Sequence, residues 1–222
     1  MSRNIAIDGP AGAGKSTIAK KVAAQLGFIY VDTGAMYRAI GVYMLDNQVD
    51  KADLAAVEAA LEHISVEIAY VDGEQKVLLN GECVNHRIRT EEVGLAASAF
   101  SAIGLVRAKL LDLQRELAAK TDVVMDGRDI GTMVLPNADC KVYLTASSRV
   151  RAERRYKELT EKGQMADLDQ IEEDIKARDH QDMTRAIAPL RQAGDAVLVD
   201  SSEMNIDEVT ECILNIFRKC NA

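Results

Sequence analysis

Short apolar runs separated by longer segments of helical periodicity dominate the pattern of this chain. Five such runs predict strands that are buried on both faces, at residues 4–7, 28–31, 123–125, 141–145 and 196–199. Uninterrupted apolar strands that alternate with helices are typical of parallel sheets. The pattern therefore predicts an α/β fold in which a five-stranded parallel sheet carries helices on both faces.

Three helical segments have clear start or stop signals. The first is expected from Ser16 to about residue 26, ending at Gly27, since glycine accepts the left-handed conformation that closes helices. A second helical pattern covers residues 90–119, with Thr90 as its N-cap and Gly104 as a point of interruption. The last helix is expected to begin near residues 205–207. Its apolar face carries Val209, Ile213, Ile216 and Phe217.

One segment departs from this α/β rhythm. Residues 65–70 alternate between apolar and polar, Asp72-Gly73 is a hairpin signal, and residues 76–79 form a second short run before Asn80-Gly81. This predicts a small antiparallel β insertion. Because no linker rich in Pro, Gly or Ser divides the chain, we expect a single domain over residues 1–222.

The stretch after the first apolar run carries the strongest chemical signal. Residues 9–16 read G-P-A-G-A-G-K-S and fit G-x-x-x-x-G-K-[ST] at every fixed position, between a predicted strand and a predicted helix. Glycines let backbone N–H groups turn toward phosphate oxygens, and the helix N-terminus adds its positive end. Lys15 supplies a cation for the β- and γ-phosphates, and Ser16 a hydroxyl for Mg²⁺. The predicted ATP-binding residues are Gly9, Pro10, Ala11, Gly12, Ala13, Gly14, Lys15, Ser16 and Thr17.

Polar residues follow the second and third predicted strands, at the edge where open parallel sheets bind ligands. After the second strand comes D-T-G, in which Thr33 is the expected N-cap, and Arg38 lies early on the following helix. After the third strand comes D-G-R-D at residues 126–129. Asp126 fits the carboxylate that holds Mg²⁺ in phosphate-binding-loop proteins, often through water.

An arginine-dense region precedes the fifth strand. Arg149, Arg151, Arg154 and Arg155 lie within seven residues, and Arg151 and Arg155 share a helical face. One interpretation is a solvated helix, because glutamates are interspersed. The other is a mobile lid over about residues 149–186, whose guanidinium groups close over phosphates and exclude water.

Composition narrows the possible partners. The net charge is −8, from 35 acidic and 27 basic residues, which counts against a general nucleic-acid binder. No apolar run approaches the roughly 20 residues that span a bilayer, and residues 1–7 are too short for a signal peptide. We therefore expect a cytoplasmic protein with small-molecule partners, and no nucleic-acid or membrane partner.

Cysteines and histidines show no pattern that binds metal. We expect the four cysteines to be reduced core residues and the histidines to lie on the surface or in helices, without a catalytic role. These residues are Cys83, Cys140, Cys212, Cys220, His63, His86 and His180.

Four motifs together resemble the bacterial-type cytidylate kinase family of nucleoside-monophosphate kinases. They are G-P-A-G-A-G-K-S, D-T-G-A-M-Y-R, D-G-R-D-I-G-T and, at residues 178–190, R-D-H-Q-D-M-T-R-A-I-A-P-L. The likeness covers essentially the whole chain in order, and the last two motifs are more specific than the loop. It implies a monomeric enzyme that uses ATP and Mg²⁺ to convert CMP or dCMP to CDP or dCDP. The β insertion is similar to the small sheet in that family's acceptor-binding region, here about residues 33–107.

The resemblance also implies an acceptor site for the phosphate, base and sugar of a cytidine nucleotide. The residues that match its positions are Thr33, Arg38, Ser98, Arg107, Arg128, Asp129, Arg178, Asp182 and Arg185. Ser98 and Asp129 match positions that read cytosine or hold the monophosphate, and Asp182 matches a carboxylate on the sugar hydroxyls.

The residues implied to act in the transfer itself form a smaller set. They are Lys15, Arg128, Arg154 and Arg185. Arg154 and Arg155 match lid arginines on the donor phosphates, and Ser16 and Asp126 are the expected metal ligands.

Three other functions share parts of this pattern. A small-molecule kinase of the shikimate or gluconate type has the same loop, but such chains are generally shorter and need no β insertion. A GTP-dependent switch protein requires an N-K-x-D motif, which this sequence lacks. A nucleotide-binding RNA partner is disfavoured by the acidic charge balance.

Overall fold

The computed structural model describes residues 2–71 and 73–220, and the chain divides into two compact units. The first unit comprises the chain up to Tyr30 and from Lys120 onward, and the second unit comprises Val31–Ala119. The second unit includes the predicted acceptor-binding excursion, residues 33–107. A single functional domain with this excursion stays a prediction.

A five-stranded parallel sheet with the order β2-β6-β1-β7-β8 confirms the predicted α/β fold. Its strands are β1 (Asn4–Asp8), β2 (Ile29–Asp32), β6 (Val123–Gly127), β7 (Cys140–Thr145) and β8 (Val197–Asp200). Each predicted strand is present, with ends that differ by one or two residues. The difference matters at β1, because the strand extends to Asp8 and so places that carboxylate directly before the glycine-rich loop.

Helices α1 (Lys15–Leu26) and α8 (Ile206–Cys220) build the core of the first unit with the sheet. Gly27 ends α1 with φ 69°, as the sequence predicts. On α8, Val209, Ile213 and Phe217 are buried, while Ile216 is partly buried against the same core. The apolar periodicity of α8 thus sets the face that packs.

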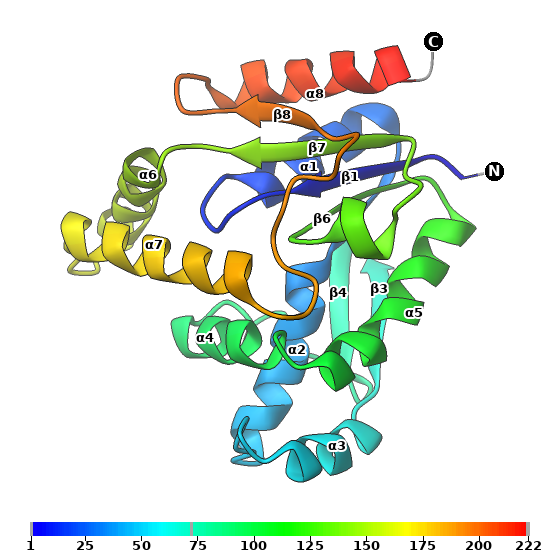
Figure 1. Ribbon diagram of the computed structural model, residues 1–222, viewed down its shortest axis with the longest axis vertical. Coiled ribbons are helices and arrows are strands. Elements are labelled where there is room, and N and C mark those ends of the chain that lie inside the picture. The colour runs from blue at the N-terminus through cyan, green and yellow to red at the C-terminus, as the bar shows by residue number, and fades with distance from the viewer. Residues whose placement is uncertain (1, 72, 221–222) are drawn as a thin grey trace. The chain divides into compact units, whose positions relative to one another are not determined.

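Two further helices lie beyond the carboxyl ends of the strands of the first unit (Figure 1). They are α6 (Ser148–Glu161) and α7 (Leu168–Thr184), which pack side by side. A short π-helical turn, η1 (Ile130–Val134), follows β6. Together α6 and α7 cover the predicted lid region.

The second unit contains four helices and a small antiparallel sheet among its described residues (Figure 1). The elements are α2 (Thr33–Asp46), α3 (Leu54–Glu62), α4 (Glu91–Phe100), α5 (Gly104–Lys120), β3 (Val66–Val71), β4 (Glu74–Leu79) and β5 (Glu82–Cys83). The predicted hairpin of β3 and β4 is confirmed, although Asp72 of its turn signal lies outside the described residues. Strand β5 was not predicted, because two residues are too short to show alternation.

Two capping predictions for the second unit had different outcomes. Thr90 does cap α4, since its hydroxyl accepts a hydrogen bond from Val93 N, and the 90–119 pattern breaks before Gly104. Thr33 is not the N-cap of α2. The Asp32 carboxylate accepts from Ala35 N at 2.9 Å, which places Thr33 in the first turn.

The cysteine prediction was wrong for two of the four residues. Cys140 is buried and Cys212 is partly buried, but Cys83 and Cys220 are exposed. The short strand β5 and the last turn of α8 carry these two to the surface. All three histidines are exposed, as predicted.

No single helix of the described chain is long and apolar enough to cross a membrane. The helices α4 and α5 reach that composition only as a pair, and they are bent by 99° at their junction.

Candidate functional site

The loop between β1 and α1 depends on glycines in positions that exclude a side chain. Gly9 has φ 154°, and a Cβ added there would lie 1.9 Å from the backbone oxygen of Leu144 on β7. Gly12 and Gly14 have φ 74° and 84°, the left-handed region that favours glycine. This backbone supplies the turned N–H groups that a phosphate cradle requires.

Lys15 lies folded over this loop. Its Nζ donates a hydrogen bond to the Pro10 carbonyl oxygen at 2.7 Å, and its side chain is buried. Burial, together with the positive charge of Arg128, lowers the pKa of Lys15 to about 7, against the opposing effect of Asp126 and other carboxylates. The protein groups around Lys15 therefore do not fully stabilise its ammonium form, and a bound anion such as phosphate would do so.

Ser16 and Asp126 meet as the sequence predicts for a Mg²⁺ site. Ser16 Oγ donates to Asp126 Oδ2 at 3.0 Å, and the hydroxyl of Tyr30 donates to Asp126 Oδ1 at 2.9 Å. A hydroxyl and a carboxylate are hard oxygen ligands, and Mg²⁺ usually takes few of these from protein, with phosphates and waters completing its shell. The chemistry of these two donors fits this cation.

Three arginines and two carboxylates form a charged cluster in the same unit, and its centre is Asp182. Arg128 Nε donates to Asp182 Oδ2 at 2.8 Å, and Arg185 lies 3.8 Å from Asp182 Oδ1 and 3.6 Å from Asp129 Oδ1. Burial alone would raise the pKa of Asp182, but Arg128 and the other two arginines outweigh it and hold that pKa below its usual value. Among these five side chains, the three positive charges exceed the two negative charges in a largely buried site.

Arg178 is the third arginine of this cluster. Its Nε is buried and has no hydrogen-bond partner among the described residues, and burial with the neighbouring Arg128 lowers its pKa. A buried N–H group without a hydrogen-bond partner is costly, and an anion that accepts from it would remove that cost. The arrangement favours a bound phosphate near Arg128 and Arg178.

The segment after α7 holds Arg185 in place. Arg185 Nε donates to the Ala188 carbonyl oxygen at 2.7 Å, and Leu190 N donates to the Asp182 carbonyl oxygen at 2.8 Å. Ala188 adopts φ 49°, which is uncommon for a residue with a side chain. The R-A-I-A-P-L motif therefore folds back on its own arginine.

In the second unit, Arg38 and Arg107 are fixed around α2. Arg38 donates to the Ile88 carbonyl oxygen at 2.9 Å, and its guanidinium lies so close to Gly94 that a Cβ there would meet it at 3.1 Å. Arg107 lies over the ring of Tyr37 at 5.4 Å and donates to the Ser101 carbonyl oxygen at 3.2 Å.

Two predicted acceptor residues of the second unit differ in environment. Thr33 is buried in the first turn of α2. Ser98 lies one helical turn beyond Gly94 on α4, and its buried Oγ has no hydrogen-bond partner among the described residues. An unsatisfied buried hydroxyl in a native fold calls for a partner, and a ligand is one explanation.

Helix α6 carries an arginine whose contacts the sequence alone did not reveal. Arg151 is buried, donates to the Ala11 carbonyl oxygen at 2.8 Å and forms an ion pair with Asp179 of α7 at 2.6 Å. It therefore links the glycine-rich loop to both helices of the lid region. In the sequence, the one indication that Arg151 belongs to the site was its position one helical turn before Arg155 in the arginine-dense region.

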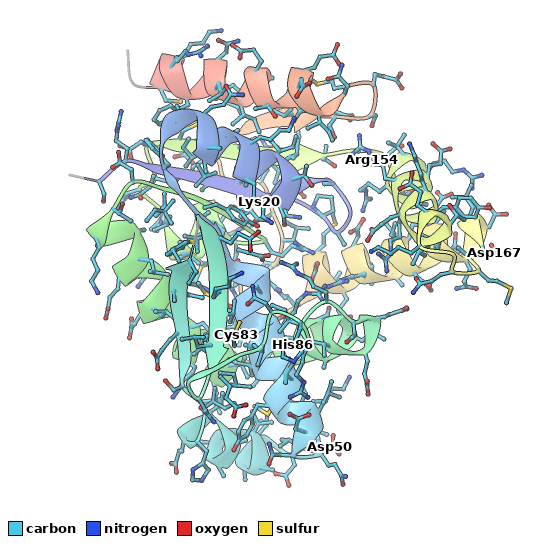
Figure 2. The ribbon with its side chains drawn as sticks, turned by 180° about the vertical axis from the view of Figure 1, so that it is seen from behind. Lys20, Asp50, Cys83, His86, Arg154 and Asp167 are labelled. Atoms are coloured by element: carbon cyan, nitrogen blue, oxygen red, sulfur yellow. The ribbon has the colours of Figure 1, made fainter. Side chains whose placement is uncertain are left out.

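The guanidinium groups of Arg154 and Arg155 have different partners. Arg154, labelled in Figure 2, donates to the Ser201 carbonyl oxygen at 2.7 Å, beyond the end of β8. Arg155 forms an exposed ion pair with Glu158 at 2.9 Å. Asp167, at the outer start of α7 in Figure 2, caps that helix through Asp169 N and Gln170 N. A role for Arg154 and Arg155 on donor phosphates stays a prediction.

The buried carboxyl of Asp8 makes stability depend on pH. Burial raises the pKa of Asp8 from 3.8 to about 6, although the N–H groups of Gly131 and Ile130 oppose the rise. Because the folded-state pKa of Asp8 is above the unfolded value, folding favours the protonated carboxyl. Its contribution to the free energy of unfolding is therefore largest at low pH and is lost as pH rises through about 6.

An Asp8→Asn variant isolates this effect, since its amide does not titrate. Between pH 4.5 and pH 7.5 we expect the wild type to lose about 2 kcal/mol of unfolding free energy relative to Asp8→Asn. Urea unfolding of both proteins across this range measures the difference. Parallel pH curves for the two proteins would contradict the raised pKa.

Comparison with known proteins shows which family shares these motifs. The sequence model described as cytidylate kinase matches residues 5–219. The chain belongs to the cytidylate kinase family. A cytidylate kinase of Caldicellulosiruptor bescii is 51% identical over 216 residues, covering 97% of this chain and 96% of that protein. A cytidylate kinase of Lactobacillus johnsonii is 49% identical, covering 97% and 94%.

Solved structures support the fold alone. An uncharacterized protein from Eubacterium ventriosum aligns with a TM-score of 0.55 and 13% identity, covering 98% of this chain and 99% of that one. The family resemblance inferred from the four motifs is confirmed by the sequence relatives. As a member of the cytidylate kinase family, the protein is a nucleoside-monophosphate kinase, and its family implies the use of ATP.

Proposed function

We propose that this protein transfers the γ-phosphoryl group of ATP to CMP or dCMP, with Mg²⁺, and releases ADP and CDP or dCDP. The observation that carries the proposal is the arginine cluster of Arg128, Arg178 and Arg185 around Asp182, in which the positive charge of Arg128 also acts on the pKa of Lys15. A phosphate cradle with a second cationic group beside it suits a reaction between two phosphorylated molecules. Family membership favours a nucleotide acceptor over shikimate or gluconate.

On the donor side, the backbone N–H groups of the loop bind the β- and γ-phosphates, and Lys15 spreads positive charge over them. Ser16 and Asp126 would hold the Mg²⁺, and the bound cation would neutralise phosphate charge. Tyr30 holds the Asp126 carboxylate in the orientation that the structure shows. Arg154 and Arg155 of α6 complete the donor site by closing over the phosphates.

On the acceptor side, Arg128 binds the phosphate of CMP, Arg178 and Arg185 lie near the transferred phosphoryl group, and Asp182 accepts from the sugar hydroxyls. A phosphate oxygen of CMP attacks the γ-phosphorus, and the bond from that phosphorus to the departing ADP oxygen breaks. Negative charge spreads over the transferred oxygens in the transition state, so fixed cations lower the barrier without forming a covalent enzyme intermediate. From the second unit, Thr33, Arg38 and Arg107 add acceptor contacts.

Ser98 and Asp129 read the base. Cytosine offers an exocyclic amine donor where uracil offers a carbonyl acceptor, so a hydroxyl and a carboxylate accept from cytosine and are left unpaired with uracil. The buried, unpartnered Oγ of Ser98 supports this role.

Replacing either base-reading residue should narrow the discrimination against uracil. In Ser98→Ala and Asp129→Ala we expect the kcat/KM ratio of CMP to UMP to fall about tenfold, the value of one buried hydrogen bond. Steady-state assays with both acceptors give the ratio. An unchanged ratio in both variants removes these residues from base recognition.

One assay tests the function itself. Purified protein with Mg²⁺ and ATP is given CMP, dCMP, UMP, AMP, GMP or shikimate, and ADP release is followed by a coupled enzyme. We expect fastest turnover with CMP or dCMP. Preferred turnover of shikimate, or of no nucleoside monophosphate, would overturn the proposal.

We further propose that the enzyme acts as a cytoplasmic monomer. The residues assigned to both substrates come from one chain, so activity requires no second copy. Light scattering during gel filtration, with and without nucleotides, tests the oligomeric state.

A further inference from the structure

Asp8 occupies the junction between the donor loop and the D-G-R-D-I-G-T motif. It is the last residue of β1 and directly precedes Gly9, and its backbone pairs with Gly127 of β6 and Tyr143 of β7. The residue is buried, with 4% of its surface exposed. Its position is therefore fixed by both neighbouring strands.

The carboxylate of Asp8 reaches across to the start of η1. Oδ1 accepts a hydrogen bond from Ile130 N, and Oδ2 accepts one from Gly131 N, each at 2.7 Å. Bonds from two N–H groups to one ionised carboxylate are among the stronger hydrogen bonds in proteins. They also satisfy two donors of η1 that have no partner within that turn.

These contacts enclose Arg128 and Asp129. On one side of this pair, Gly127 is held by its register with the backbone of Asp8. On the other side, Ile130 is held by the Asp8 carboxylate. A single residue thus fixes both ends of the segment that carries two of the proposed acceptor-binding side chains.

Gly131 shows how closely this clamp is packed. A Cβ added to Gly131 would lie 3.3 Å from Asp8 Oδ2 and 3.1 Å from Cδ of Lys141. Contacts this short leave no space for a methyl group unless the carboxylate or the lysine moves. A methyl group at position 131 would therefore press directly on the carboxylate that accepts from Gly131 N.

We propose that Asp8 is a positioning residue that sets Arg128 and Asp129 at a fixed place relative to the ATP-binding loop. The inference rests on the proposed role of Arg128 in binding the acceptor phosphate. This role does not require Asp8 to contact either substrate. It acts through the backbone of Ile130 and Gly131, and because β1 continues from Asp8 into Gly9, it ties the acceptor arginine to the start of the donor loop.

The Asp8→Asn variant tests this role with little change in shape. An amide oxygen accepts only one of the two N–H groups, and the amide nitrogen then faces the other donor. We expect the dissociation constant for CMP, measured calorimetrically, to rise about tenfold, and that for ATP to change less than threefold. We also expect kcat to fall, since the two phosphates lose alignment.

Asp122→Asn is the matched control. Asp122 also accepts a backbone N–H, from Arg3 at 2.7 Å, but Arg3 directly precedes β1 and Asp122 directly precedes β6, at the opposite end of these strands. We expect both nucleotide affinities of this variant to stay within twofold of the wild type. Equal weakening of CMP and ATP in Asp8→Asn, or no weakening of either, overturns the proposal, because a general structural defect does not separate the two ligands.

Two further variants make the outcome decisive. If Asp8→Asn does not fold, Gly131→Ala tests the same clamp from its other side and should show the same selective loss of CMP affinity. If neither variant folds, Asp8 serves the fold itself and the proposal is overturned. Arg128→Ala separates the two hypotheses: unchanged CMP affinity there refutes the proposed acceptor role, whereas a loss there without a loss in Asp8→Asn refutes the positioning role alone.

Discussion

Lys15→Met is expected to lower kcat by about 10²- to 10³-fold while the protein stays folded. The lysine is the loop's own cation, and loss of one preorganised charge that stabilises the transition state typically has an effect of this size. Folding should be retained because burial already disfavours the Lys15 ammonium group, whose pKa is lowered to about 7. A coupled assay of ADP formation with CMP as acceptor measures the loss, and circular dichroism checks the fold.

Lys21→Met is the control for this substitution. Lys21 lies on the same helix, but its Nζ forms an exposed ion pair with Asp207 at 2.7 Å, away from the loop. Exposed pairs contribute little, so kcat and stability should be nearly unchanged. Near-normal turnover in Lys15→Met would show that the donor site is assigned wrongly.

Gly9→Ala is expected to lower the free energy of unfolding by about 3 kcal/mol and to abolish measurable ATP binding. The added Cβ would lie 1.9 Å from the Leu144 carbonyl oxygen, so β7 or the loop must move. Overpacking against a backbone atom is among the more destabilising kinds of substitution. Either movement displaces the N–H groups that surround the phosphates. Urea unfolding and ATP calorimetry measure the two effects.

Gly14→Ala separates the clash from backbone strain. Gly14 also has a positive φ, 84°, but a Cβ there meets nothing within 4 Å. Left-handed strain alone amounts to about 1–2 kcal/mol. If both variants are destabilised equally, contact with Leu144 is not what requires glycine at position 9.

The predicted elements succeeded where the local signal was strong. The run before Gly9, the stop at Gly27 and the Thr90 cap each depend on neighbouring residues, and the structure has all three. Predictions failed where two adjacent residues competed for one role. Asp32 and Thr33 are both good caps, and the carboxylate of Asp32 also accepts from Arg89 at 2.9 Å, a contact that no local pattern shows.

Family motifs identified the charged residues without their geometry. Arg128 and Arg185 were expected near phosphate and Asp182 on the sugar hydroxyls, yet the sequence did not indicate that the Asp182 carboxylate accepts a hydrogen bond from Arg128 at 2.8 Å. Asp8, Tyr30 and Arg151 were missed as site residues. Each acts through a partner more than 90 positions away, on Gly131, Asp126 and Ala11 respectively, so sequence spacing carries no sign of the contact.

The sequence by itself determined the α/β class, the phosphate-binding loop and the family, because these depend on hydrophobic period and on contiguous motifs. Only the tertiary structure decided which charges meet, and that the Asp8 carboxylate accepts from the backbone of Ile130 and Gly131. Parallel strands bring distant segments together, and the low-dielectric interior then fixes which pairs form and which groups shift their pKa. The pairing of charges and the pKa shifts depend on distances in space, and the order of residues along the chain does not give those distances.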